Sequence, residues 1–271
     1  MNNNLNISEK PTNPLKRPLN IIFCLPGTSF SNHFLLSWSE LMLYCLTHDI
    51  RPFISCHQNS NIYHVRNGCL GGDILRGSRQ VPFDGKLDYD FIMWIDSDQV
   101  FSPTHFETLL RRDKEVVSGL YLMQGGGHYA VVPEWDVSYF KKHGCFEFLS
   151  RPMLEQWVEK HCIGTPTEKK NEQTGQMIKD YTSCSFPLMK VSYTGLGWTL
   201  VKKGVFEKMT YPWFCAEMEE FELTNEKDGT VKKIKELLSE DVSFCKRLEK
   251  MDIPVYVDIE AIVGHEKTIV F

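Results

Sequence analysis

The sequence has little of what marks several common classes of protein. It contains no apolar stretch long enough to span a bilayer, and residues 1–18 lack the apolar core of a secretory signal. It has no lysine- or arginine-rich block, and a formal net charge of −5 does not suit a protein built around nucleic-acid phosphates. Internal repeats are also lacking. We therefore expect a globular, cytoplasmic protein without a membrane span.

Cysteine is present, but not in the spacing of a metal or redox site. The nine cysteines include no Cys-x-x-Cys pair, which disfavours a zinc ribbon or a thioredoxin-type site. Several lie within apolar runs, as Cys24 does. We interpret them as small buried hydrophobic residues in a reducing cytoplasm.

The composition is that of an ordinary globular protein, with 42% hydrophobic residues in a chain of 271. Residues 1–18 are polar and interrupted by proline, which predicts a flexible N-terminal arm. Residues 19–271 have the length of one α/β domain. We divide this domain into a half at about 19–125 and a half at about 126–271.

Apolar runs alternate with segments of helical periodicity in the first half of the chain. Strands are predicted at 19–25, 51–56, 91–95 and 115–121, and helices at 31–47, 61–75 and from Pro103 onward. This alternation indicates an α/β fold with a mostly parallel sheet. Later segments predict a strand-like stretch at 191–201, helices at 203–209 and 239–250, and a strand at 254–259. The polar stretch 160–180 is interpreted as a loop, a lid or an insertion.

The most informative segment is the apolar run 91–95, which stops at Asp96-Ser97-Asp98. Two carboxylates at the carboxyl end of a buried strand lie where α/β proteins bind ligands, and their oxygens suit Mg²⁺ or Mn²⁺. A second Asp-x-Asp, at residues 88–90, precedes the run and is read as the entry to the strand. The alternative for Asp96 and Asp98 is a solvated turn that leads to Ser102, the cap of the helix that begins at Pro103.

Two further acidic or basic segments could take part in chemistry. Glu240 and Asp241 follow Ser239, a helix cap, so they either complement the helix dipole or face a cleft, where Asp241 would accept a proton. His265 follows an apolar strand and Gly264. It is either an ordinary surface residue or a third ligand for Mn²⁺.

In their order and spacing, these segments resemble a GT-A glycosyltransferase of the family 2-like branch, which includes viral and phage forms. The resemblance covers roughly residues 19–267 and is carried by the Asp96–Asp98 motif, the Tyr193–Gly197 segment, Glu240-Asp241 and Gly264-His265. It implies a Rossmann-like, mostly parallel central sheet with helices on both faces and small C-terminal elements on the acceptor side. If the protein is viral, the host cytoplasm is its expected location.

The resemblance implies a nucleotide-diphosphate sugar as donor substrate and Mn²⁺ or Mg²⁺ as cofactor. Asp98 would bind the metal directly, Asp96 would contact the ribose or the metal's water shell, and His265 would be the C-terminal metal ligand. The rest of the donor site would be formed by Pro26, Gly27, Thr28, Arg66, Ser97, Gly195 and Gly197.

Catalytic roles follow from the same resemblance. Asp241 matches the base of inverting members, which takes the acceptor proton while the acceptor oxygen attacks the anomeric carbon. Glu240 would contact the acceptor. Trp213 and Phe214 could stack on a sugar face or anchor a loop. Retention of configuration stays open, because the role of Asp241 rests on the resemblance.

The sequence leaves the substrates and two other functions open. A glycan is the expected acceptor, with a protein or a modified nucleic-acid base as alternatives, and a uridine- or guanosine-diphosphate sugar is the expected donor. A nucleotidyltransferase would use the same paired aspartates, but Pro26–Phe30 offers it no basic residue. A non-catalytic sugar- or nucleotide-binding module is the other alternative.

Overall fold

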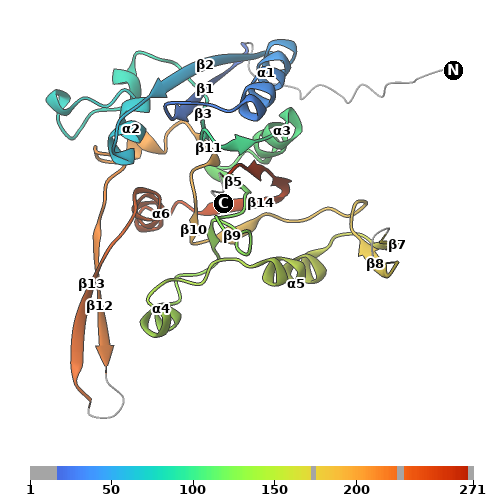
Figure 1. Ribbon diagram of the computed structural model, residues 1–271. Helices are drawn as coiled ribbons and strands as arrows, with labels where there is room; N and C mark the ends of the chain where they lie inside the picture. The colour runs from blue at the N-terminus through green and yellow to red at the C-terminus, as the bar shows by residue number, and fades with distance from the viewer. Residues whose placement is uncertain (1–16, 172–174, 225–228, 268–271) are drawn as a thin grey trace.

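The fold is α/β and is built on one seven-stranded sheet (Figure 1). The computed structural model describes residues 17–171, 175–224 and 229–267. The strands of the sheet, in spatial order, are β2 (Ile50–His57), β1 (Leu19–Pro26), β3 (Phe91–Ile95), β11 (Trp198–Lys202), β5 (Val116–Leu120), β14 (Val255–Ile262) and β9 (Met189–Val191). The α/β class predicted from the sequence is confirmed.

The central sheet is only partly parallel, whereas a mostly parallel sheet was expected. β1 pairs in parallel with β2 and β3, and β5 pairs in parallel with β14. β11 runs antiparallel between β3 and β5, and β9 pairs antiparallel with β14. A parallel neighbour needs a crossover connection of a dozen or more residues. Residues 121–197 separate β5 from β11, and a connection of that length allows β11 to enter the sheet in either direction.

Helices cover both faces of the sheet, as expected. They are α1 (Asn32–Thr47), α2 (Ile62–Cys69), α3 (Pro103–Arg112), α4 (Val137–His143), α5 (Arg151–His161) and α6 (Glu240–Lys250). α1 and α3 share one buried core with Phe23 of β1. α2 and α6 share another core with Trp94 of β3. Successive strand residues point to opposite faces, so β1 and β3 supply both cores and read as continuous apolar runs.

β3 determines where the acidic motif lies. All five of its residues are buried, and the three that follow, Asp96 to Asp98, are half-buried. Because β1 and β3 are parallel, Pro26 at the end of β1 and Asp96 lie at the same edge of the sheet. β11 is antiparallel to β3, so the segment 195–197 before β11 lies at that edge too.

Four two-stranded pairs extend from the central sheet. They are β4 (Gln99–Val100) with β15 (Gly264–His265), β6 (Val131–Val132) with β10 (Tyr193–Thr194), β7 (Thr167–Lys170) with β8 (Met177–Asp180), and β12 (Met218–Thr224) with β13 (Val231–Leu237). The β4–β15 pair sets His265 opposite Gln99, directly after the acidic motif. In Figure 1 the β12–β13 ribbon projects away from the rest of the protein.

Two polar stretches form ribbons. The described part of 160–180, which the sequence left as a loop, a lid or an insertion, contains the end of α5 and the β7–β8 pair. The polar residues 218–224 form β12. In the β12–β13 ribbon, Lys235 faces Glu220 with Nζ and Oε1 2.8 Å apart. Such cross-strand charge pairs stabilise ribbons that have few apolar residues to bury.

Two predicted helices are shorter than expected. The helix predicted at 61–75 ends at Cys69, and a 3-10 turn follows at Ile74–Arg76. Gly71, with a φ of +69°, adopts a left-handed conformation that ends the helix. The helix predicted at 203–209 is only a 3-10 turn, Phe206–Lys208.

The predicted flexible arm, residues 1–18, lies outside the described residues except for Arg17 and Pro18. The Arg17 guanidinium lies 2.9 Å from Asp90 and 3.3 Å from Asp88. The second Asp-x-Asp lies at the entry to β3, as expected, and its pairing with Arg17 was not foreseen. Among the described residues, no helix is both long and apolar enough to cross a membrane.

Candidate functional site

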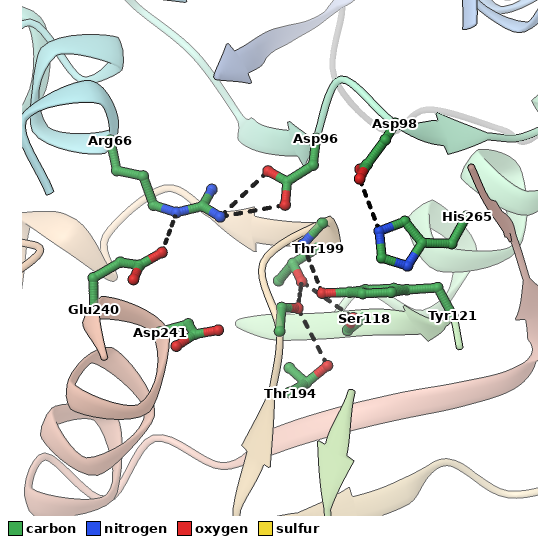
Figure 2. Close-up of polar contacts among 12 residues, drawn as sticks. Arg66, Asp96, Asp98, Ser118, Tyr121, Thr194, Thr199, Glu240, Asp241 and His265 are labelled. Carbon is green, nitrogen blue, oxygen red and sulfur yellow. Dashed lines mark hydrogen bonds and ion pairs between the residues drawn. The ribbon is translucent and has the colours of Figure 1, made fainter. Parts of the chain in front are cut away.

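The acidic motif after β3 separates into two groups of side chains (Figure 2). Asp96 turns toward Arg66 of α2, and Asp98 turns toward His265 of β15. We name these groups the Arg66 cluster (Arg66, Asp96, Glu240) and the Asp98 cluster (Asp98, His265, Lys267).

In the Arg66 cluster, one guanidinium holds carboxylates from two distant segments. Arg66 Nε donates to Glu240 Oε1 over 3.1 Å, and Nη2 donates to Asp96 Oδ1 over 3.3 Å. The guanidinium also lies 5.4 Å from the ring centroid of Trp94, within cation–π distance. The side chains of Arg66 and Glu240 are only 4% and 10% exposed, so the pair is shielded from water. The two acidic motifs recognised in the sequence thus belong to one site.

Burial and neighbouring charges shift ionisation in the Arg66 cluster. Burial lowers the pKa of Arg66, but Asp96 and Glu240 outweigh it and raise that pKa above its usual range. Burial and then Asp241 raise the pKa of Glu240, and Arg66 offsets only part of that rise. The ionised form of Glu240 therefore depends on the permanent charge of Arg66.

In the Asp98 cluster, two basic side chains converge on one carboxylate oxygen. His265 Nε2 lies 3.0 Å from Asp98 Oδ2, and Lys267 Nζ donates to the same oxygen over 2.6 Å. Burial would raise the pKa of Asp98, but the hydrogen bonds from His265 and Lys267 prevail and lower it to about 2. Lys267 was not anticipated from the sequence. The available signal was its spacing, because alternate residues of an extended strand point the same way.

The backbone fastens this cluster to the acidic motif. Glu266 N donates to the carbonyl of Asp98 over 2.8 Å, and the Glu266 carboxylate accepts the hydroxyl of Ser31 at the start of α1. His265 Nδ1 lies 2.6 Å from the carbonyl oxygen of Leu122. Both ring nitrogens of His265 face acceptor oxygens, an arrangement that favours the doubly protonated ring. Burial lowers the pKa of His265, but Asp98 and the Leu122 carbonyl raise it more.

The three residues predicted to bind metal do not converge on one point. In the described part of the chain, no group of three or more His, Cys, Asp or Glu side chains could hold a metal ion. Asp98 and His265 are adjacent, while Asp96 is engaged by Arg66. Mg²⁺ is commonly held by one or two protein ligands together with substrate phosphates and water, and an imidazole beside a carboxylate suits Mn²⁺. Asp98 and His265 could therefore supply two ligands to such an ion, and not the three that were expected.

The segment before β11 lies directly beneath the acidic turn. A Cβ at Gly195 would overlap the hydroxyl of Tyr121, and one at Gly197 would lie 2.9 Å from Gln99 Nε2. Gly197 N donates to Tyr121 Oη over 3.1 Å, and Gly197 O accepts from Asp96 N over 3.0 Å. Close packing thus explains both glycines, and it ties this segment to the acidic motif.

The loop after β1 meets the acidic turn from the other side. Pro26 is buried at the end of β1, and Thr28 is exposed. A Cβ at Gly27 would lie 2.8 Å from Cβ of Ser97, too close for any larger residue without a shift. Gly27 therefore lies against Ser97, and Pro26 and Thr28 flank it in the loop at the edge where a nucleotide was expected.

Asp241 lies in the first turn of α6 and is held by three donors. Val242 N donates to Oδ1 over 2.9 Å, the Ser239 hydroxyl also donates to Oδ1, and Tyr193 Oη donates to Oδ2 over 2.7 Å. Ser239 occupies the cap position as predicted, but its side chain binds Asp241 rather than a backbone N–H. The contact of Tyr193 was not predicted, because only Gly195 and Gly197 of its segment were expected to take part in the site.

Trp213 and Phe214 are not available to stack on a sugar. Both are buried, with exposed fractions of 0% and 1%. Phe214 packs edge-on against Trp94, and its backbone is bracketed by the amide of Asn67. The alternative reading, a pair that anchors the chain in the core, is the one the structure supports.

The chain was compared with known proteins. No protein-family model matches it, and no curated protein matches it. Among solved structures, A197 from STIV is similar, with 16% sequence identity and a TM-score of 0.46 over 92% of this chain and 86% of that one. A likeness of this size says nothing about activity.

Proposed function

We propose that the protein is a glycosyltransferase that moves a sugar from a nucleotide-diphosphate sugar to an acceptor hydroxyl with inversion. One observation carries this proposal: Arg66 joins Asp96 of the acidic turn to Glu240 of α6, so a carboxylate from each motif shares one site. A diphosphate site next to a carboxylate that can take a proton is what sugar transfer needs.

The donor would lie across the acidic turn. Asp98 and His265 would hold Mn²⁺ or Mg²⁺, which supplies charge neutralisation on the leaving diphosphate. His265 would first give up the proton on Nε2, since metal ligands must be deprotonated. Lys267 brings a permanent positive charge to the same place and would pair with the diphosphate once Asp98 is engaged elsewhere. Asp96, held by Arg66, would accept hydrogen bonds from the ribose.

The transferred sugar would lie on the floor made by Gly195 and Gly197. The acceptor hydroxyl would approach from α6, where Asp241 takes its proton. The acceptor oxygen forms a bond to the anomeric carbon while the bond from that carbon to the diphosphate oxygen breaks. Glu240, fixed by Arg66, would receive a hydrogen bond from the acceptor. We propose a glycan as acceptor.

Melting measurements with nucleotide sugars test this proposal. We expect a uridine- or guanosine-diphosphate sugar to raise the melting temperature only when Mn²⁺ is present. Ligand at one hundred times its Kd adds about 2.7 kcal/mol, which is roughly 5 °C or more for a chain of this size. Asp98→Asn should remove the metal-dependent part, and Asp241→Asn should keep it.

A matched control comes from the second Asp-x-Asp. Asp88→Asn makes the same chemical change away from the site and should leave the shift intact. The proposal fails if no nucleotide diphosphate shifts melting in a metal-dependent way.

A further inference from the structure

Tyr193 is a buried tyrosine whose hydroxyl reaches one carboxylate. Its side chain is 7% exposed, and Oη donates to Asp241 Oδ2 over 2.7 Å. Burial and the charge of Asp241 raise the pKa of Tyr193 well above its usual range. The hydroxyl therefore keeps its proton at every physiological pH and acts as a donor.

The ring of Tyr193 is fixed by strand pairing and by aromatic packing. β10 pairs with β6, setting Tyr193 opposite Val132. The ring centroid lies 6.3 Å from that of Trp135 and 6.2 Å from that of Phe148. A side chain held in this way presents its hydroxyl at one fixed place.

The two oxygens of Asp241 are used differently. Oδ1 accepts from Val242 N in the first turn of α6 and from the hydroxyl of Ser239, the cap of that helix. Oδ2 accepts from Tyr193, its one hydrogen-bond partner in the described chain. Contacts from its own helix therefore tie Oδ1 down, whereas the direction of Oδ2 is set from a different element.

We propose that Tyr193 is a positioning residue of the transfer reaction: it aims Asp241 Oδ2 so that its remaining lone pair meets the acceptor hydroxyl. This inference rests on the proposed role of Asp241 as the base. Tyr193 is also two residues before Gly195, so one short segment carries both the side chain that orients Asp241 and the proposed floor under the sugar. A misplacement of the base by about 1 Å can cost a hundredfold in rate.

Other charged or titratable groups surround Asp241 and belong to the same electrostatic environment. They come from α2, from the end of β5 and from α6 itself, and they are Tyr63, Arg66, Tyr121, Glu240 and Cys245. Among the described residues, two side chains bond to the carboxylate: Ser239, the cap of α6, and Tyr193, which comes from a distant element.

Kinetics of Tyr193→Phe provide the first test, with donor hydrolysis or transfer as the assay. We expect kcat to fall by about ten- to a hundredfold while the KM for the nucleotide sugar stays within about twofold. Equal kcat in the two proteins, or a loss confined to KM, would overturn the proposal.

The matched control is Tyr89→Phe. Tyr89 is also buried and donates to a carboxylate, Glu207 Oε1, over 2.6 Å, at the opposite end of β3 from the acidic motif. This variant removes the same kind of hydrogen bond at a similar cost in stability. Its kcat and its KM for the nucleotide sugar should match those of the wild type.

A ¹³C NMR measurement tests the hydrogen bond from Tyr193 to Asp241 separately from the proposed glycosyltransferase activity. In protein labelled with ¹³C at aspartate carboxyl groups, Asp241→Asn identifies the Asp241 signal. That signal should shift in Tyr193→Phe and stay in place in Tyr89→Phe. A signal indifferent to Tyr193→Phe would disprove the hydrogen bond even in an active enzyme. A shifted signal in a protein that turns over no nucleotide sugar would instead disprove the proposed function.

Discussion

Replacing Arg66 with methionine should expose how much the protein depends on the Arg66 cluster. The substitution leaves the carboxylates of Asp96 and Glu240 without their cation. Removing one member of a buried ion pair costs roughly 3–5 kcal/mol. The side chain of Asp96 is 31% exposed and regains some hydration, so we expect about 3 kcal/mol, at the lower end of that range.

Thermal and denaturant unfolding measure this loss. For a chain of this size, about 3 kcal/mol corresponds to a fall of roughly 6–12 °C in melting temperature. Arg66 offsets part of the rise in the pKa of Glu240, so removing Arg66 raises that pKa further. A carboxyl whose folded pKa exceeds its unfolded value binds its proton more tightly when folded. The deficit of the variant should therefore be largest above the folded pKa of Glu240 and shrink as pH falls through it.

A second substitution shows where the deficit originates. Glu240→Gln, added to Arg66→Met, removes one unpaired charge and should recover part of the stability. Arg112→Met is the matched control, because Arg112 pairs with the buried carboxylate of Asp258 at 2.6 Å. Glu240→Gln should not rescue that variant. A loss below about 1 kcal/mol on Arg66→Met, or no rescue by Glu240→Gln, would refute the reasoning.

Three further predictions concern other parts of the molecule. Gly195→Ala should weaken donor binding at least about tenfold in calorimetry, because the new Cβ overlaps a buried hydroxyl. Gly127→Ala has open space around it and should bind the donor normally. Equal affinities in the two variants would contradict the packing argument. Lys267→Met should weaken binding of a nucleoside diphosphate about tenfold and reduce the salt dependence of that binding. Unchanged affinities at low and high salt would show that Lys267 does not contact the phosphates. The sulfur atoms of Cys162 and Cys184 are 2.7 Å apart, so hydrogen peroxide should oxidise the two thiols to a disulfide and be reduced to two waters. If the tryptic peptides that contain these cysteines stay separate without reductant, the prediction is wrong.

The sequence predicted the strands that are fully buried and the helices that bury one face. β3 matches its apolar run, and α1 begins after Ser31 as its pattern indicated. The direction of β11 could not be foreseen, because the long connection from β5 to β11 is compatible with a parallel or an antiparallel neighbour. Periodicity likewise could not distinguish Trp213 as a core residue from one that faces a ligand.

The candidate site was predictable where a charged residue interrupts an apolar pattern. Asp96, Asp98, Asp241 and His265 all stand at such interruptions. Tyr193 and Lys267 do not, since a tyrosine in a strand and a lysine near a terminus are common on grounds of packing and solubility alone. Their partners come from remote segments, so their roles became visible only when the tertiary contacts were known.

Release of nucleoside diphosphate from a nucleotide sugar is the measurement that tests the central claim most directly. Wild-type protein with Mn²⁺ and a panel of donors should release the diphosphate, slowly to water and faster to an acceptor. Asp241→Asn should bind the same donor and release almost none. Equal release by the wild type and Asp241→Asn, or no release from any donor, would contradict the account.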